Sequence, residues 1–325
     1  AKVEHPTARL LISASSLQDR SARDGTTTTI LLTSELLQNS LELVRMGIHP
    51  SVILNGYNIA LEESLKELKR ISKNIEYPES ELAIISTSLA GKIEEGTAEV
   101  LTSCALEAAS LLENEEGGDD LERLRIKRLQ VDSGKMKDSR LVQGLVLAKT
   151  RLDSSTPSSS KHGKIAIIDG EFENKKIELE ASIEISDIGS LKSFHDRDAE
   201  KIQETVDHIS SLGVNILIVR DGVVDEAVTP LRNAGIITYR RMERNDIELL
   251  AKITGATPIR NPLNIDIRNV GNYSKHAEEL VAGVKYTTIE GEEAGGMTFI
   301  INGTTPEVRS EVKRAFDDAL GVAHR

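Results

Sequence analysis

The stretch that decides the fold is RDGTTTTILLTSELL, residues 23–37, in which an acid, a glycine and four threonines lead into a helical pattern. The first turn of a helix has backbone N–H groups without intrahelical partners, and the helix dipole makes that end positive. Such an end can bind phosphate, with Asp24 holding Mg²⁺ and the threonines meeting phosphate oxygens. The alternative is a structural N-cap, because Asp and Thr favour that position without any ligand. Residues 24–29 alone favour the cap.

The composition narrows the class of protein. A length of 325 residues predicts two or three domains with a substantial core. The net charge is −12 and both signs are interspersed, so we expect no nucleic-acid partner and no membrane-binding face. No apolar run approaches the roughly 20 residues that span a bilayer, and the opening AKVEHPTARL lacks a signal-peptide core. The single cysteine, Cys104, lies in a helical apolar pattern. These features predict a soluble, cytoplasmic protein with a buried thiol.

The first part of the chain has helical periodicity. Three helices are predicted within residues 6–71, with a break between Gly47 and Pro50. Their apolar stripes have no obvious partners. Two further helices are predicted near 79–90 and 96–113, followed by short strands at 123–131 and 140–149.

The second part alternates between strand and helix patterns. Residues 153–162, DSSTPSSSKH, are polar and without periodicity, which predicts a linker or mobile loop. The block that follows predicts a parallel or mixed sheet flanked by helices. Its strands are expected at 164–169, 177–185, 214–219 and 236–241, and its helices at 196–212, 224–234 and 246–254. A further strand is expected at 296–301, followed by a helix from 305.

Two features of the second part of the chain raise a functional question. Ile188, Leu191 and Phe194 lie among polar residues, so they form either an exposed apolar tip or, as composition favours, a staple against the domain. Asp318 lies in the C-terminal half of a predicted helix, where the helix dipole disfavours an acid.

Several stretches together resemble one family. QDRSARDGTTTTILLTSELL at 18–37 is similar to the nucleotide loop of group II chaperonins, the archaeal thermosome and the eukaryotic cytosolic chaperonin. Further similar stretches occur in the family's order from end to end: HPTARLL, MGIHPSVILNGYNIALEESLKEL, DSRLVQGLVLAKT, KIAIIDGEFENKKIELEASIEISD, LAKITGATPI and RAFDDALGV.

The resemblance implies an α/β multidomain fold. Residues 1–77 are expected to form a partial all-α equatorial, ATP-binding domain, and residues 78–146 the first half of an α+β intermediate domain. Residues 147–297 are expected to form an α/β apical, substrate-binding domain with a helical lid protrusion at about 185–212. Residues 298–325 then return to the intermediate domain. The resemblance also implies partners: other subunits in a stacked double ring, and non-native client polypeptides.

The resemblance also assigns roles to individual residues. Asp24 matches an acid that places Mg²⁺ and the phosphates of ATP, and Gly25, Thr26, Thr27 and Thr28 match the phosphate cradle. Asp318 matches the acid that orients the attacking water, so Asp24 and Asp318 are the expected catalytic residues. The residues expected to meet client polypeptide are Ile188, Leu191 and Phe194 on the lid, and Leu249, Leu250 and Ile253 on the helix at 246–254.

Two departures leave an alternative open. Arg23 stands where the family has glycine, so it either pairs with a phosphate or pairs with Asp24 and impairs the site. The family's other phosphate loop and second aspartate motif have no counterpart in this sequence, so we expect this chain alone to be inactive and ATP hydrolysis to belong to the full-length subunit. The alternative is an ATP-independent polypeptide-binding fragment or a divergent subunit. A small-molecule α/β enzyme is disfavoured, because neither G-x-G-x-x-G nor a Walker A loop follows a predicted strand.

Overall fold

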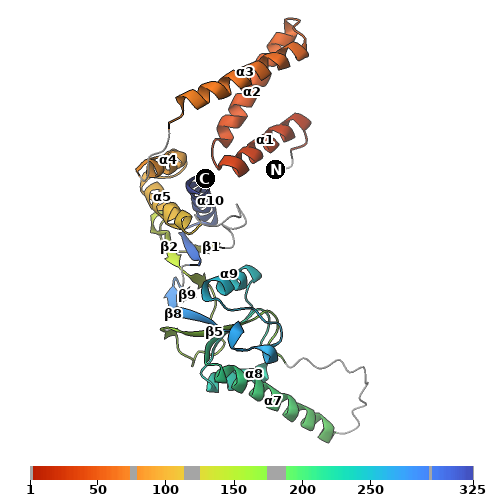
Figure 1. The fold of residues 1–325 in the computed structure, drawn as a ribbon, viewed down its shortest axis with the longest axis vertical. Helices are drawn as coiled ribbons and strands as arrows, with labels where there is room; N and C mark the ends of the chain where they lie inside the picture. Colours follow the sequence, from red (N-terminus) through yellow and green to blue (C-terminus); the bar gives the residue numbers. More distant parts are fainter. Residues whose placement is uncertain (1–2, 74–78, 113–124, 174–187, 293–294, 325) are drawn as a thin grey trace. The chain divides into compact units, whose positions relative to one another are not determined.

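The computed structural model describes residues 3–73, 79–112, 125–173, 188–292 and 295–324, and at 79 and 188–198 it describes the backbone alone. The chain divides into two compact units (Figure 1). One consists of Ala1–Ser110 and Ser310–Arg325, and the other of Leu111–Arg309. We call them the helical unit and the sheet unit.

The helical unit contains the helices predicted from periodicity. They are α1 (Pro6–Ala22), α2 (Thr26–Arg45), α3 (Pro50–Ile71), α4 (Glu79–Leu89), α5 (Glu95–Ser110) and, from residue 310, α10 (Pro306–Ala323). Proline at the first helical position begins α1 and α3, where its missing N–H costs no hydrogen bond. Tyr57 of α3 donates to the carbonyl of Leu36 on α2 at 2.7 Å, which ties these two helices together.

The apolar side chains of this unit are distributed unevenly. On α1, α2 and α3 only Ile53 is buried among the described residues, and Leu10 and Leu17 are 71% and 64% exposed. By contrast, α5 and α10 bury continuous apolar faces, including Cys104 as predicted. The predicted lack of partners for the first three stripes is therefore confirmed within the described chain.

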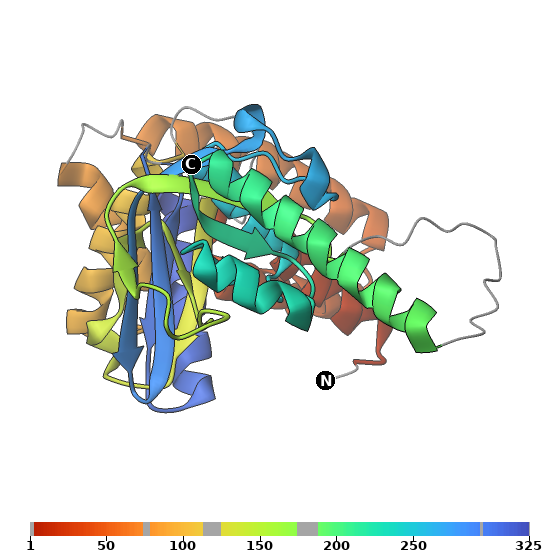
Figure 2. The same cartoon turned by 90° about the horizontal axis from the view of Figure 1, so that it is seen from below.

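The sheet unit contains two sheets (Figures 1 and 2). In the three-stranded sheet, β10 (Met297–Asn302) lies between β1 (Ile126–Val131), which is parallel to it, and β2 (Arg140–Gln143), which is antiparallel. The larger sheet has the order β3-β9-β8-β5-β6-β7, with β4 paired to β8. Its strands are β3 (Leu145–Leu147), β4 (Ser159–Ser160), β5 (Gly163–Ile168), β6 (Val214–Val219), β7 (Ile237–Tyr239), β8 (Gly271–Val281) and β9 (Val284–Gly291).

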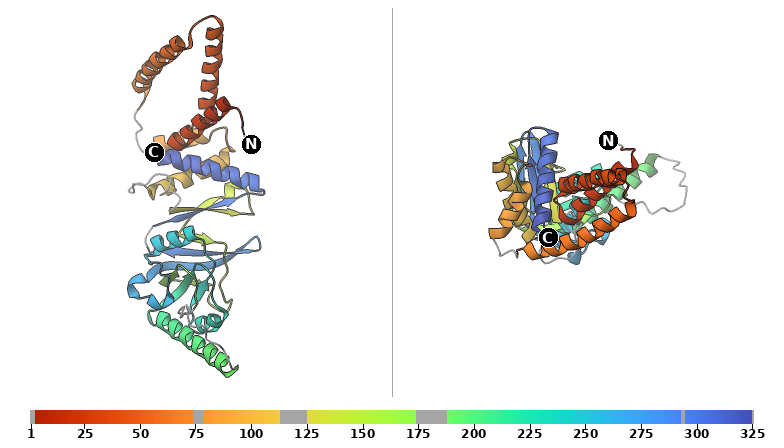
Figure 3. Two further views of the ribbon diagram at one scale, coloured as in Figure 1. Left: turned by 90° about the vertical axis from the view of Figure 1, so that its right-hand side faces the viewer. Right: turned by 90° about the horizontal axis from the view of Figure 1, so that it is seen from above.

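The larger sheet is mixed, which is one of the two arrangements, parallel or mixed, that the sequence predicts. Strands β5, β6 and β7 are parallel, whereas β3, β9, β8 and β5 pair antiparallel. Helix α9 (Arg244–Thr254) contributes to the core on one face, and α7 (Ile188–Ser211) and α8 (Asp225–Asn233) contribute to the core on the other. Figure 3 shows α7 as the longest helix of this unit. Among the described residues, no helix has the length and apolar content needed to cross a membrane.

The prediction of one strand over 140–149 is wrong. Gly144, with φ +79°, breaks the run, so β2 joins the small sheet and β3 the large one. A Cβ at Gly144 would lie 2.3 Å from the carbonyl oxygen of Ile289, so only glycine fits this bend.

The prediction of a linker or mobile loop over 153–162 agrees with the structure only in part, since residues 153–158 form neither helix nor strand but the end of the stretch pairs with the larger sheet. Ser159 and Ser160 form β4 against β8, and the Glu278 amide donates to the Ser158 carbonyl at 2.8 Å. These contacts come from residues more than a hundred positions away, so local composition gives no sign of them. The strand predicted at 177–185 lies outside the described residues.

Gly144→Ala is expected to destabilise the sheet unit by about 2 kcal/mol more than Gly283→Ala. Both glycines have φ +79°, but a Cβ at Gly283 would meet no atom within 4 Å. Comparison of the two variants therefore separates the cost of backbone strain from the cost of the clash with β9. Urea denaturation followed by circular dichroism measures both costs, and equal costs would show that the close approach at Gly144 is unimportant.

Candidate active site

The loop between α1 and α2 is built from two left-handed residues. Arg23 ends α1 with φ +55° and donates its amide to the Asp19 carbonyl at 2.9 Å. Gly25 begins α2 with φ +76°, and no side chain caps that helix. Gln18 Nε2 donates to the Asp24 carbonyl at 3.0 Å and fixes the loop from α1. The Asp24 carboxylate therefore stands beside an uncapped helix N-terminus.

Lys92 brings the two predicted catalytic acids together. It follows α4, and its amide donates to the Leu89 carbonyl at 3.0 Å. Lys92 Nζ lies 3.1 Å from Asp24 Oδ1 and 3.4 Å from Asp318 Oδ2, residues that are 68 and 226 positions away in the chain. All three belong to the helical unit.

Burial and charge act in opposite directions on Asp318. Its side chain is 15% exposed, and this burial is the main cause that raises the pKa of its carboxyl. Lys92 lowers that pKa by charge and by hydrogen bonding, Asp19 raises it and Arg314 lowers it. Asp318 is therefore a shielded carboxylate whose charge depends on a cation beside it.

The loop has the donors and acceptors that a magnesium-bound phosphate requires. A Cβ at Gly25 would lie 3.3 Å from Gln18 Nε2 in a left-handed backbone, which favours glycine there. Helix geometry leaves the first amides of α2, at Thr26, Thr27 and Thr28, without intrahelical acceptors. No group of three or more His, Cys, Asp or Glu that could hold a metal occurs among the described residues. Mg²⁺ needs no such group, since it usually binds one or two carboxylates plus phosphate oxygens and water. The residues present therefore fit Mg²⁺ with a phosphate ligand.

Sequence reasoning missed Lys92. A single lysine after a predicted helix resembles any solvated surface charge, and its two partners are distant in the chain.

The side chain of Arg23 runs beside α10, where its Cγ would lie 2.2 Å from a Cβ at Gly321.

The side chains expected to bind polypeptide on α9 are in the core. Leu249, Leu250 and Ile253 are 3%, 0% and 2% exposed and pack against the strands of the larger sheet. They present no surface to a polypeptide in this structure, which corrects the expectation for these residues. The exposed residues of α9 are polar or charged: Arg244, Asn245 and Lys252. Ile188, Leu191 and Phe194 lie in the first turns of α7, but their side chains lie outside the described residues.

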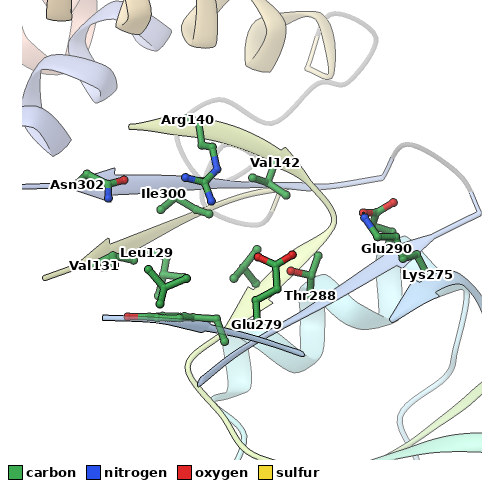
Figure 4. A pocket seen from close by; sticks show the side chains of 13 residues that line it. Leu129, Val131, Arg140, Val142, Lys275, Glu279, Thr288, Glu290, Ile300 and Asn302 are labelled. Carbon is green, nitrogen blue, oxygen red and sulfur yellow. The ribbon is translucent and has the colours of Figure 1, made fainter. Parts of the chain in front are cut away.

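A pocket of about 200 Å³ lies between the two sheets of the sheet unit (Figure 4). Apolar side chains such as Leu129 and Ile300 line it, and Arg140, Glu279 and the Lys275–Glu290 pair also contribute to its lining. None of the predicted site residues contributes to it.

These features define a mixed α/β protein with a helical N-terminal region and a paired-carboxylate site. The whole chain, residues 1–325, matches the model of the TCP-1/cpn60 chaperonin family. The chain belongs to this family.

Individual relatives agree with that assignment. A thermosome subunit of Pyrococcus horikoshii is 32% identical over 326 residues, which cover 98% of this chain and 59% of the relative. A thermosome subunit of Methanocaldococcus jannaschii is 33% identical over 323 residues, with the same two coverages of 98% and 59%. The chain thus spans 59% of the length of these curated relatives.

A solved structure shares the fold. The open-state monomer of a group II chaperonin from Methanococcoides burtonii superposes with a TM-score of 0.62 and 28% sequence identity. The match covers 92% of this chain and 70% of that chain. The mixed α/β chaperonin-like fold predicted from the resemblance is therefore confirmed.

Proposed function

We propose that this chain contains the nucleotide loop and the catalytic acid of an ATP-dependent protein-folding chaperonin subunit. The observation that carries the proposal is the convergence of Asp24 and Asp318 on Lys92 at 3.1 and 3.4 Å. Two acids, one in the loop before α2 and one on α10, share one lysine and form a site whose charge balance a phosphate group can change. Family membership and the uncapped helix at Gly25 support the same function.

Each residue has a distinct part in the proposed mechanism. Mg²⁺ would supply Lewis-acid stabilisation to the phosphates of ATP, with Asp24 as its protein ligand. The amides of Thr26, Thr27 and Thr28 donate to phosphate oxygens at the positive end of α2. Asp318 accepts a hydrogen bond from the attacking water and aims it, as a positioned carboxylate does in phosphoryl transfer.

Lys92 makes the site responsive to nucleotide. Its single positive charge is shared between the two acids, and a phosphate would compete for the same ammonium. Transfer of Lys92 to phosphate would take from Asp318 a cation that lowers the pKa of its carboxyl, so Asp318 would depend on the other cations at the site to stay charged. The charge balance of the site therefore changes when ATP binds.

The remaining parts of the proposal concern domains and partners. We assign 1–77 to the equatorial domain, 78–146 and 298–325 to the intermediate domain, and 147–297 to the apical domain. The subunits assemble into a stacked double ring, and the first turns of α7, with Ile188, Leu191 and Phe194, meet non-native polypeptide or one another in a lid. Hydrolysis is coupled to lid closure through α10, which carries Asp318.

Asp24→Asn is expected to weaken binding of Mg²⁺-ATP to the assembled full-length protein at least roughly tenfold, because the magnesium loses its carboxylate ligand. Isothermal titration calorimetry with ATP, with and without Mg²⁺, measures the change. Glu35→Gln is the matched control, since Glu35 is an exposed acid on α2, the helix that follows the loop of Asp24. Equal affinities in Asp24→Asn and wild type would favour the ATP-independent polypeptide-binding alternative.

A further inference from the structure

Arg23 and Gly321 form a close contact between the nucleotide loop and α10. The three heavy atoms nearest to a Cβ built on Gly321 all belong to the Arg23 side chain: Cγ at 2.2 Å, Cβ at 3.0 Å and Cδ at 3.2 Å. Gly321 is buried on α10, and both residues belong to the helical unit. No side chain larger than hydrogen fits at position 321 while the aliphatic stem of Arg23 passes there.

Both residues are unfavourable choices for their local backbone. Arg23 has φ +55°, a conformation that glycine adopts far more readily than arginine. Gly321 lies within an 18-residue helix, where glycine is the poorest residue except proline. A strained residue persists when its surroundings hold it in place. The packing of the arginine stem over the glycine accounts both for arginine at position 23 and for glycine at position 321.

The contact is one helical turn from the proposed catalytic acid. Asp318 and Gly321 are three residues apart on α10, so they lie on the same side of the helix. The same loop that presents Asp24 also presents Arg23. A stem packed at Gly321 therefore sets the spacing between the two acids that face Lys92.

We propose that Arg23 is a positioning residue for ATP hydrolysis, which fixes the Asp318 end of α10 against the nucleotide loop through its contact with Gly321. This inference rests on the proposed function of Asp24 and Asp318. The Arg23 stem acts by packing, so it changes the rate of the chemical step and leaves the affinity for ATP nearly unchanged.

A double-mutant cycle on the assembled full-length protein tests the proposal. Gly321→Ala is expected to lower the melting temperature by roughly 5 °C, since its new methyl group overlaps the Arg23 stem. It should lower kcat for ATP hydrolysis at least roughly tenfold and change KM by less than about twofold. Arg23→Lys, which keeps the aliphatic stem, should retain kcat, whereas Arg23→Gly should lose it to a similar extent.

The sign of the Gly321→Ala effect on melting should reverse in the Arg23→Gly background, where alanine restores helix propensity without a clash. The double variant should have the kcat of Arg23→Gly alone. An equal loss of melting temperature in both backgrounds would overturn the contact. If the effect of Gly321→Ala on the melting temperature depends on Arg23 but kcat in Gly321→Ala is unchanged, the contact exists and the positioning role is overturned. Failure of the proposed function itself would instead appear as wild-type hydrolysis in Asp318→Asn, whatever the result of the cycle.

Discussion

Asp318→Asn is expected to lower kcat for ATP hydrolysis by the assembled full-length protein at least roughly a hundredfold, with little change in the dissociation constant for ATP. The amide keeps the size of the side chain but loses the negative charge that orients the attacking water. Asp318 is 15% exposed and lies 3.4 Å from Lys92 Nζ. Little bulk water reaches this carboxylate, so solvent does not compensate for the lost negative charge. The effect should therefore fall on the chemical step.

Asp317→Asn is the control for this result. It removes an acid from the adjacent position on the same helix, where Asp317 lies 3.8 Å from Lys313 Nζ. Steady-state hydrolysis and equilibrium nucleotide binding should be measured on both variants. Comparable turnover in the two would mean that Asp318 has no special role.

The sheet unit is expected to lose about 3 kcal/mol of stability as the pH falls from 6.5 to 4 because of His276 alone. His276 is 1% exposed, and burial is the main cause that lowers its pKa from 6.5 to about 4, with Arg151 acting in the same direction and Glu278 opposing. Its Nε2 is 2.7 Å from the Tyr239 hydroxyl, and Nδ1 is 3.5 Å from the Ser160 hydroxyl. The neutral imidazole is therefore the form that the fold accommodates.

The sign follows from proton binding. Below pH 6.5 the unfolded chain binds a proton at this histidine, while the folded chain does so only near pH 4, so acid favours unfolding within that window. The stability is fully present above pH 6.5 and reaches its lower limit below pH 4.

Urea denaturation of wild type and His276→Gln at pH 7 and pH 4.5 isolates this contribution. Glutamine can form hydrogen bonds but does not titrate, and the carboxylates that titrate in acid are common to both proteins. The difference in unfolding free energy between the two pH values should be larger in wild type by about 2 to 3 kcal/mol. An equal pH dependence in both proteins would show that His276 is not held neutral by the fold.

Elements with strong periodicity could be predicted from the sequence. Strand β6 (Val214–Val219) has the predicted bounds because it is a short, buried apolar run. Helix α3 ends at Ile71 as expected because its apolar residues keep helical spacing up to that point, although only Ile53 among them is buried. The hairpin of β8 and β9 was missed. Most of β8 alternates between buried and exposed positions only weakly, and its two-residue turn uses Ala282, an unusual residue at φ +50°, before Gly283.

The differences between prediction and structure at 140–149 and at 153–162 have different causes. Gly144 inside an apolar run is a recognised signal for a bend, so that error was avoidable. Ser159 and Ser160 pair with β8, a strand more than a hundred positions away, and local composition does not contain that information.

The candidate site likewise contains residues that could be predicted from the sequence and residues that could not. The loop from Asp24 to Thr28 and the unfavourable placement of Asp318 could both be read from sequence, since each is a local chemical pattern. Lys92 and the Arg23–Gly321 contact could not, because they depend on which helices are adjacent in space. The three leucine and isoleucine residues of α9 were misassigned because an apolar stripe predicts burial as readily as a binding surface.

The nucleotide that remains bound after a single round of binding tests the central claim most directly. Asp318→Asn protein is mixed with ATP and Mg²⁺ and quenched in acid after several wild-type turnover times, and the bound nucleotide is separated by chromatography. The proposed roles of Asp24 and Asp318 predict bound ATP in this variant, bound ADP in Asp317→Asn, and little bound nucleotide in Asp24→Asn. ADP formed in Asp318→Asn at the wild-type rate would contradict the assignment of Asp318 to catalysis.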